Sequence, residues 1–184
     1  VDYTLSYANN IEPGTATVMI KGINNFKNDR YETFVITPAP VYNLEATPTS
    51  ASSVKLTWNH AHNVTGYEIN SGGDHQKYYG TTSSNSFEVI GLESGKTYQF
   101  SVRSYTMLNG EKKWSEWSEV TAMTDIAAPS DVKGGTGSKG TATISWSKSA
   151  NVDGYAVYRA TSLDGNYALA ATVPLRYGSY TDRY

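Results

Sequence analysis

The segments Leu56–Trp58 (Leu-Thr-Trp) and Gly66–Tyr67 decide the fold of this chain, because the pair occurs twice. The second copy, Ile144–Trp146 (Ile-Ser-Trp) and Gly154–Tyr155, lies 88 positions later and keeps the nine-residue step from Trp to Tyr. Apolar residues two positions apart point to the same face of a β-strand, so this pattern predicts a strand with one inward face. A displacement of 88 residues exceeds the ~20–50 residues of a solenoid repeat. The sequence therefore predicts a duplicated β-domain.

Alternating, β-rich segments occur along the rest of the chain and predict further strands. They are Thr15–Ile20, Thr33–Ile36, Ser53–Trp58, Ser86–Ile90 and Thr97–Val102. Turn-forming pairs such as Pro13-Gly14 and Asn109-Gly110 separate them. Because no segment keeps a 3.6-residue period, the predicted fold class is all-β.

The composition limits the possible functions. The chain has 184 residues, 15 Tyr, 4 Trp, no Cys and a formal net charge of -2, which gives no field that would attract nucleic acid or an anionic membrane. No apolar run approaches the length of a membrane span. Eukaryotic extracellular modules of this size commonly carry a disulfide, so the absence of Cys favours a bacterial source, with a cytosolic protein as the alternative. The start of the chain has no signal-peptide pattern, which we expect of a piece of a longer secreted protein.

The segment 39–125 resembles a fibronectin type III domain. The resemblance rests on spaced features over one domain length: Pro40, Trp58, Gly66-Tyr67, Gly91-Leu92 and the run Tyr98-x-Phe100-x-Val102. It implies a β-sandwich in which Trp58, Tyr67, Leu92 and Tyr98 are structural residues.

The segment 126–184 resembles the same family through Val132, Trp146, Gly154 and Tyr155, with Trp146 and Tyr155 as structural residues. It reaches only the family's fifth strand, near Ser179–Asp182. The equivalent of the Tyr-x-Phe-x-Val strand is missing. Unless another segment supplies that strand, we expect an open sheet edge and an exposed core here.

Residues 1–38 resemble the C-terminal half of a bacterial immunoglobulin-like repeat, as found in surface proteins of Gram-positive gut bacteria. The resemblance rests on Asp2–Tyr7, Asn9–Ile11, Gly14–Val18 and Phe34-x-Ile36. Together the three segments predict tandem immunoglobulin-like and fibronectin type III β-sandwiches, cut at both ends from a longer multidomain protein.

The string Trp114–Ser118 (Trp-Ser-Glu-Trp-Ser) resembles the Trp-Ser box of class I cytokine receptor domains, in which cationic side chains interleave with the two Trp rings. If Phe100 and Val102 face inward, Arg103 faces outward and can stack on Trp114 or Trp117; Lys112 and Lys113 are further candidates. The string then braces the surface of the domain. A receptor function is the least favoured alternative, because such receptors carry cysteines. The other alternative is a sugar-stacking platform made of Tyr78, Tyr79, Trp114 and Trp117.

Other motifs give no support for catalysis or cofactors. His60 and His62 belong to one loop and His75 to the next, at opposite poles of a sandwich, so we expect no metal site. No thiol nucleophile and no Gly-x-Ser-x-Gly elbow is present. The glycine-rich stretch 134–140 lacks the ending of a phosphate loop and is interpreted as a mobile loop.

The sequence therefore predicts non-catalytic spacer or interaction modules of a larger secreted or wall-attached bacterial protein, located outside the cell. Proline-containing linkers at 37–40 and 127–129 are suited to such spacing. The alternative is an accessory glycan-binding module of a carbohydrate-active enzyme or adhesin. The expected partners are neighbouring domains of the same chain, with a glycan or protein of the host or cell wall as a possible ligand.

Overall fold

The computed structural model describes residues 2–25, 27–138 and 140–183, and all regular elements among them are β-strands. The predicted all-β class is confirmed. By internal contacts the chain divides into two compact units. The first comprises residues 1–47, 54–89 and 98–122, and the second comprises 48–53, 90–97 and 123–184. The three predicted domain boundaries stay a prediction.

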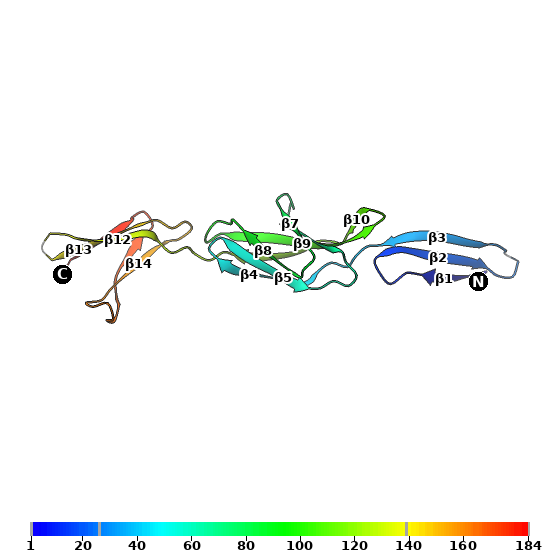
Figure 1. Cartoon of the computed structure of the whole chain (residues 1–184), viewed down its shortest axis with the longest axis horizontal. Coiled ribbons are helices and arrows are strands. Elements are labelled where there is room, and N and C mark those ends of the chain that lie inside the picture. The colour runs from blue at the N-terminus through cyan, green and yellow to red at the C-terminus, as the bar shows by residue number, and fades with distance from the viewer. Residues whose placement is uncertain (1, 26, 139, 184) are drawn as a thin grey trace. The chain divides into compact units, whose positions relative to one another are not determined.

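The first strands form one antiparallel sheet of β1 (Tyr3–Ala8), β2 (Gly14–Gly22) and β3 (Asp29–Ile36), in that order (Figure 1). The register is regular along both pairs, with Leu5 opposite Ile20 and Ala16 opposite Phe34. Most side chains of β1 and β3 are exposed, and Ala16 is the one fully buried apolar residue of the three strands. The assignment of this segment to an immunoglobulin-like repeat stays a prediction.

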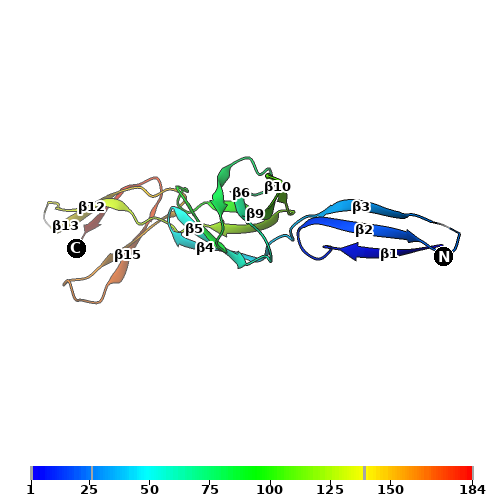
Figure 2. The ribbon, with the colours of Figure 1, turned by 45° about the vertical axis from the view of Figure 1, so that its right-hand side comes forward.

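The next eight strands form two sheets. They are β4 (Tyr42–Ser50), β5 (Ser53–Asn59), β6 (Gly66–Ser71), β7 (Tyr78–Thr82), β8 (Ser86–Ile90), β9 (Thr97–Leu108), β10 (Glu111–Trp114) and β11 (Ser118–Met123). One sheet has the order β4-β5-β8 and the other β10-β9-β6-β7, with β11 also paired to β9. Figure 2 shows β4 and β5 on one side of this sandwich and β6, β9 and β10 on the other.

The centre of this sandwich is filled by the residues that the Leu-x-Trp and Tyr-x-Phe-x-Val patterns predicted to face inward. Leu56 and Trp58 from β5 are buried, as are Tyr67 from β6 and Phe100 and Val102 from β9. Alternating side chains from the two inner faces meet in this way in aligned sandwiches. The predicted strand 97–102 continues to Leu108, because β9 pairs with β10 beyond the core.

The remaining strands are β12 (Ser130–Thr136), β13 (Thr141–Ser147), β14 (Gly154–Arg159), β15 (Ala168–Pro174) and β16 (Ser179–Arg183). They form a sheet with the order β12-β13-β16 and a two-stranded sheet of β14 and β15. The fifth strand of this copy, β16, covers the expected Ser179–Asp182. The interpretation of the whole stretch 134–140 as a loop is wrong: Gly134–Thr136 belong to β12, because they pair with β13 from Ala142 to Ile144.

The described residues contain no helix with the length and hydrophobicity needed to cross a membrane.

Candidate functional site

The Trp-Ser string contributes to an ordered stack of cationic and aromatic side chains on the outer face of the β6–β9–β10 sheet. The guanidinium carbon of Arg103 lies 3.8 Å from the centre of the Trp114 ring and 4.3 Å from the centre of the Trp117 ring. At these distances both rings attract the cation through their π-electrons. Arg103, as predicted from strand alternation, is the shared partner of the two tryptophans.

Glu68 fixes the guanidinium of Arg103 from the neighbouring strand. The two residues are opposite each other in the β6–β9 register. Arg103 donates from Nε and Nη2 to Oε1 of Glu68, at 3.2 and 2.7 Å. The side chains are only 23% and 14% exposed, so this ion pair is more shielded from water than an ordinary surface pair. The stack is thus held by a charged hydrogen bond in the plane of the guanidinium as well as by its aromatic contacts.

The stack continues beyond the two tryptophans. The ring of His75, from the β6–β7 connection, lies 4.5 Å from the ring of Trp117 at an interplanar angle of 16°. Lys112 places Nζ 5.0 Å from the centre of the Trp114 ring and 4.3 Å from that of Tyr105. We call the set His75, Trp117, Arg103, Trp114 and Lys112 the cation–aromatic stack. Lys113, the other predicted cation, pairs with Glu111.

The serines of the string shape the backbone that presents the two tryptophans. β10 ends at Trp114 and β11 begins at Ser118, so the string spans the break between these strands. Ser104 and Ser115 join β9 to this break: Ser115 N–H donates to the Ser104 carbonyl and Ser104 N–H donates to Ser115 Oγ, each at 3.0 Å. Ser118 Oγ donates to the Val41 carbonyl at 2.6 Å. The two serines therefore act as structural donors and acceptors.

Glu119 lies beside the stack and receives several hydrogen bonds. Its carboxylate accepts from Gly73 N–H at 2.9 Å, from Gln99 Nε2 at 2.7 Å and from Ser101 Oγ at 3.2 Å. His75 Nε2 is 3.9 Å away. The pKa of Glu119 is lowered below 4.5, chiefly by the hydrogen bond from the backbone N–H of Gly73. The hydrogen bond from Ser101 and the electrostatic interaction with His75 lower it further. The ionised carboxylate thus ties the β6–β7 connection to β9 and β11.

We expect acid to weaken this tie. Because the pKa of Glu119 is lower in the folded state, its contribution to stability is present above about pH 4.5 and is lost as pH falls through the folded pKa. The melting temperature of the wild-type chain should fall more steeply below pH 4.5 than that of Glu119→Gln, which cannot ionise. Thermal unfolding from pH 6 to pH 3 measures this difference, and equal slopes for the two proteins would contradict the role given to Glu119.

Tyr78 and Tyr79, the other predicted sugar-stacking residues, lie on the edge strand β7 but point differently. Tyr78 is 58% exposed. Tyr79 is half-buried, its ring lies 5.9 Å from Phe100, and burial is the main cause that raises its pKa above 10.0. The two rings therefore do not form one continuous platform, and Tyr78 alone offers an open face.

The three histidines are not gathered into one site. His60 is 3.3 Å from the hydroxyl of Tyr67, His62 approaches Glu12 at 3.5 Å, and His75 belongs to the stack. Within residues 2–25, 27–138 and 140–183, no three His, Asp or Glu side chains meet as metal ligands would.

The other predicted structural residues are found in equivalent places in the two copies. Trp58 packs against Tyr67 with ring centres 5.1 Å apart, and Trp146 packs against Tyr155 at 5.0 Å. Leu92 is buried, and Tyr98 is half-buried with its ring 6.2 Å from that of Phe100.

Sequence reasoning missed three of the residues that hold the stack: Glu68, His75 as a ring partner, and Glu119. Glu68 could have been found, because it is the outward-facing residue of β6 next to the inward Tyr67 and Ile69. His75 and Glu119 depend on the path of the β6–β7 connection, which no local pattern gives.

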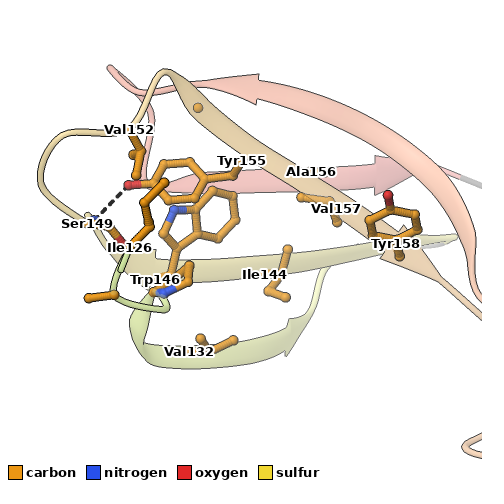
Figure 3. A pocket seen from close by; sticks show the side chains of 13 residues that line it. Ile126, Val132, Ile144, Trp146, Ser149, Val152, Tyr155, Ala156, Val157 and Tyr158 are labelled. Atoms are coloured by element: carbon orange, nitrogen blue, oxygen red, sulfur yellow. Dashed lines mark hydrogen bonds between the residues drawn. The ribbon is translucent and has the colours of Figure 1, made fainter. Parts of the chain in front are cut away.

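The second unit contains a pocket of about 370 Å³ beside β14 (Figure 3). Most of its lining is apolar, with Val132, Ile144, Trp146, Tyr155 and Val157 among the side chains (Figure 3). The one hydrogen bond drawn there joins Ser149 N–H to the hydroxyl of Tyr155, at 2.9 Å. The lining offers no charged group for catalysis.

The family of fibronectin type III domains matches residues 38–121. An alpha-amylase of Niallia circulans is 44% identical over 71 residues, which cover 37% of this chain and 5% of that protein. The chain thus spans a small fraction of this curated relative. A solved segment of two fibronectin type III domains from chicken tenascin covers 80% of this chain and 83% of its own, at 20% identity and a TM-score of 0.51.

The tenascin segment supports the fold alone, and the family match supports the assignment of the central sandwich. The sandwich built on Trp58 and Tyr67, with Phe100 and Val102 from β9, has the core that the resemblance implied. Residues 38–121 of this chain are therefore a fibronectin type III domain.

Proposed function

We propose that this chain is a non-catalytic spacer segment of a larger bacterial protein, secreted or attached to the cell surface, which acts on or binds carbohydrate. The observation that best supports the spacer function is the cation–aromatic stack. Arg103 is within 4.3 Å of the centres of both Trp114 and Trp117, and His75 stacks on Trp117. The two tryptophan rings are thus already in contact with other side chains of the same domain.

The linkers are consistent with a spacing role. Residues 37–41 and 124–129 have no regular secondary structure, and prolines occur at 38, 40 and 129. Proline restricts the backbone and favours extended linkers, which separate domains more effectively than glycine-rich chains. Such segments hold neighbouring domains apart without providing a site of their own.

The connection with carbohydrate rests on the similarity to an alpha-amylase of Niallia circulans. The matched 71 residues are 5% of that protein, so a segment of this kind is a minor part of a much larger enzyme there. By analogy we propose that this chain adjoins a carbohydrate-acting domain of the same protein. The extracellular location is part of the proposal.

Glycan binding by the chain itself is the second candidate, favoured by one observation. Tyr78 is 58% exposed on the edge strand β7. An aromatic face that is open to solvent can stack on the apolar face of a sugar ring. A single tyrosine gives a small contact area, which is why the spacer role is the proposed function.

Retention on insoluble polysaccharides distinguishes the two candidates. The chain is incubated with insoluble starch, cellulose and chitin, and bound protein is measured after sedimentation. We expect the wild-type chain to remain in the supernatant to the same extent as Tyr78→Ala. Retention of the wild type that is lost in Tyr78→Ala would overturn the spacer proposal and establish the glycan-binding function.

A further inference from the structure

The tip of the β9–β10 hairpin is an Asn-Gly pair, and the sequence contains this pair once. The register pairs Leu108 with Glu111, so Asn109 and Gly110 form the whole loop between the two strands. Both loop residues have positive φ angles, 52° and 84°, as the type I′ turn of a tight hairpin requires. Both are exposed. The side-chain amide of Asn109 therefore lies in a tight turn that water reaches freely.

The backbone nitrogen that follows this side chain has little steric cover. A Cβ added to Gly110 would meet no atom within 4 Å, so the space around this residue is open. Because glycine has no side chain, its backbone also adopts conformations that are closed to other residues. The backbone nitrogen of Gly110 can therefore reach the side-chain carbonyl carbon, Cγ, of Asn109 when the turn opens.

Opening of this turn costs little free energy, because the end of the hairpin has few buried contacts. β10 has four residues, and the two nearest the tip, Glu111 and Lys112, are exposed. β10 also lies at the end of its sheet, where it pairs with β9. Segments with few buried apolar contacts open locally without unfolding of the domain. The tip can thus leave the turn conformation while the core around Phe100 and Val102 stays intact.

We propose that Asn109 is a site of spontaneous deamidation, and that the reaction gradually loosens the cation–aromatic stack. The backbone nitrogen of Gly110 forms a bond to Cγ of Asn109, and the bond from Cγ to the side-chain nitrogen breaks. That nitrogen leaves as ammonia and takes up the proton of the attacking amide. Water then opens the cyclic imide at either carbonyl carbon, which gives aspartate or isoaspartate. One water is consumed for each ammonia released, and no other reactant is needed. This site is independent of the spacer function.

The isoaspartate product alters the hairpin because its backbone runs through the former side chain and is one atom longer. Loop length sets the register of a hairpin. The present register places Lys112 opposite Met107 and Trp114 opposite Tyr105. Lys112 and Trp114 belong to the stack, and the centre of the Trp114 ring lies 3.8 Å from the guanidinium carbon of Arg103. A lengthened loop no longer holds β10 in this register, so the contact of Trp114 with Arg103 weakens.

Incubation of the full chain at about 37 °C and mildly alkaline pH tests the site. Deamidation is followed by mass spectrometry of tryptic peptides, as the mass increase from amide to acid. Asn63 is the matched control: it is exposed in a turn and also has a φ of 52°, but Val64 follows it, and a branched side chain obstructs the attacking nitrogen. We expect Asn109 to react at least tenfold faster than Asn63. Equal rates at the two positions would overturn the proposal.

A second measurement tests the effect on the stack. The incubated wild-type chain is compared with equally incubated Asn109→Gly, whose Gly-Gly tip suits the same turn and cannot deamidate. We expect the β10 amides of the isoaspartate form to exchange hydrogen at least tenfold faster than those of Asn109→Gly, while the β5 amides are unchanged. Freshly prepared Asn109→Asp has the new charge without the longer backbone, and it should exchange as the fresh wild type does. Unchanged β10 exchange in the isoaspartate form would overturn the link between the hairpin tip and the stack.

Discussion

Trp58→Ala is expected to lower the free energy of unfolding of the fibronectin type III domain by about 3–5 kcal/mol. Trp58 is 3% exposed and packs its ring 5.1 Å from that of Tyr67, at the centre of the two facing sheets. Its truncation removes buried apolar surface and leaves a cavity between rigid strands, which close-packed cores cannot fill by small shifts. Hydrogen exchange of the buried amides of β6 measures the loss.

Trp146→Ala is the matched control, because the residue type and its tyrosine partner are the same. Trp146 borders the open pocket, so its neighbours have fewer packing contacts to lose. We therefore expect its removal to destabilise the second unit by less than Trp58→Ala destabilises the central domain. If Trp58→Ala leaves the β6 exchange rates unchanged, the assignment of this core is wrong.

Arg103→Ala is expected to cost about 2 kcal/mol, between the values typical of exposed and of fully buried ion pairs. The substitution leaves the Glu68 carboxylate, 14% exposed, without the cation that neutralises it. It also removes the group between the rings of Trp114 and Trp117. The change in the free energy of unfolding is measured by chemical denaturation, with hydrogen exchange of the β9 amides as the readout.

Arg103→Lys separates the two contributions. Lysine keeps a positive charge near Glu68 but lacks the planar guanidinium that stacks between rings and donates twice. We expect an intermediate loss of stability. Equal stability of Arg103→Ala and the wild type would show that the ion pair and the stack contribute nothing to the fold.

Much of the central fold could be predicted because its determinants are local. The steps from Leu56 to Trp58 and from Phe100 to Val102 reveal inward faces, since strand side chains alternate strictly. The same alternation put Arg103 on the outer face, where it meets the two tryptophans. The repeat then identified Trp146 and Tyr155 as the equivalents of Trp58 and Tyr67.

The features that could not be predicted depend on pairing between segments that are distant in the sequence. Gly134–Thr136 have a composition typical of a loop, yet they form a strand because β13 supplies hydrogen-bond partners. Tyr78 and Tyr79 look alike in sequence, but contact with Phe100 half-buries one ring only. The position of His75 on Trp117 is set by a connection held through Gly73 and Glu119. Such tertiary contacts leave no periodic signal.

The central claim is that the cation–aromatic stack braces the outer face of the domain, and a double-mutant cycle between Arg103 and Trp117 tests it most directly. The free energies of unfolding of the wild type, Arg103→Ala, Trp117→Ala and the double variant give the coupling between the two side chains. We predict a favourable coupling of about 1 kcal/mol, in the range of a partly shielded cation–π contact. A coupling of zero would contradict the brace and would leave the Trp117 ring available for a ligand.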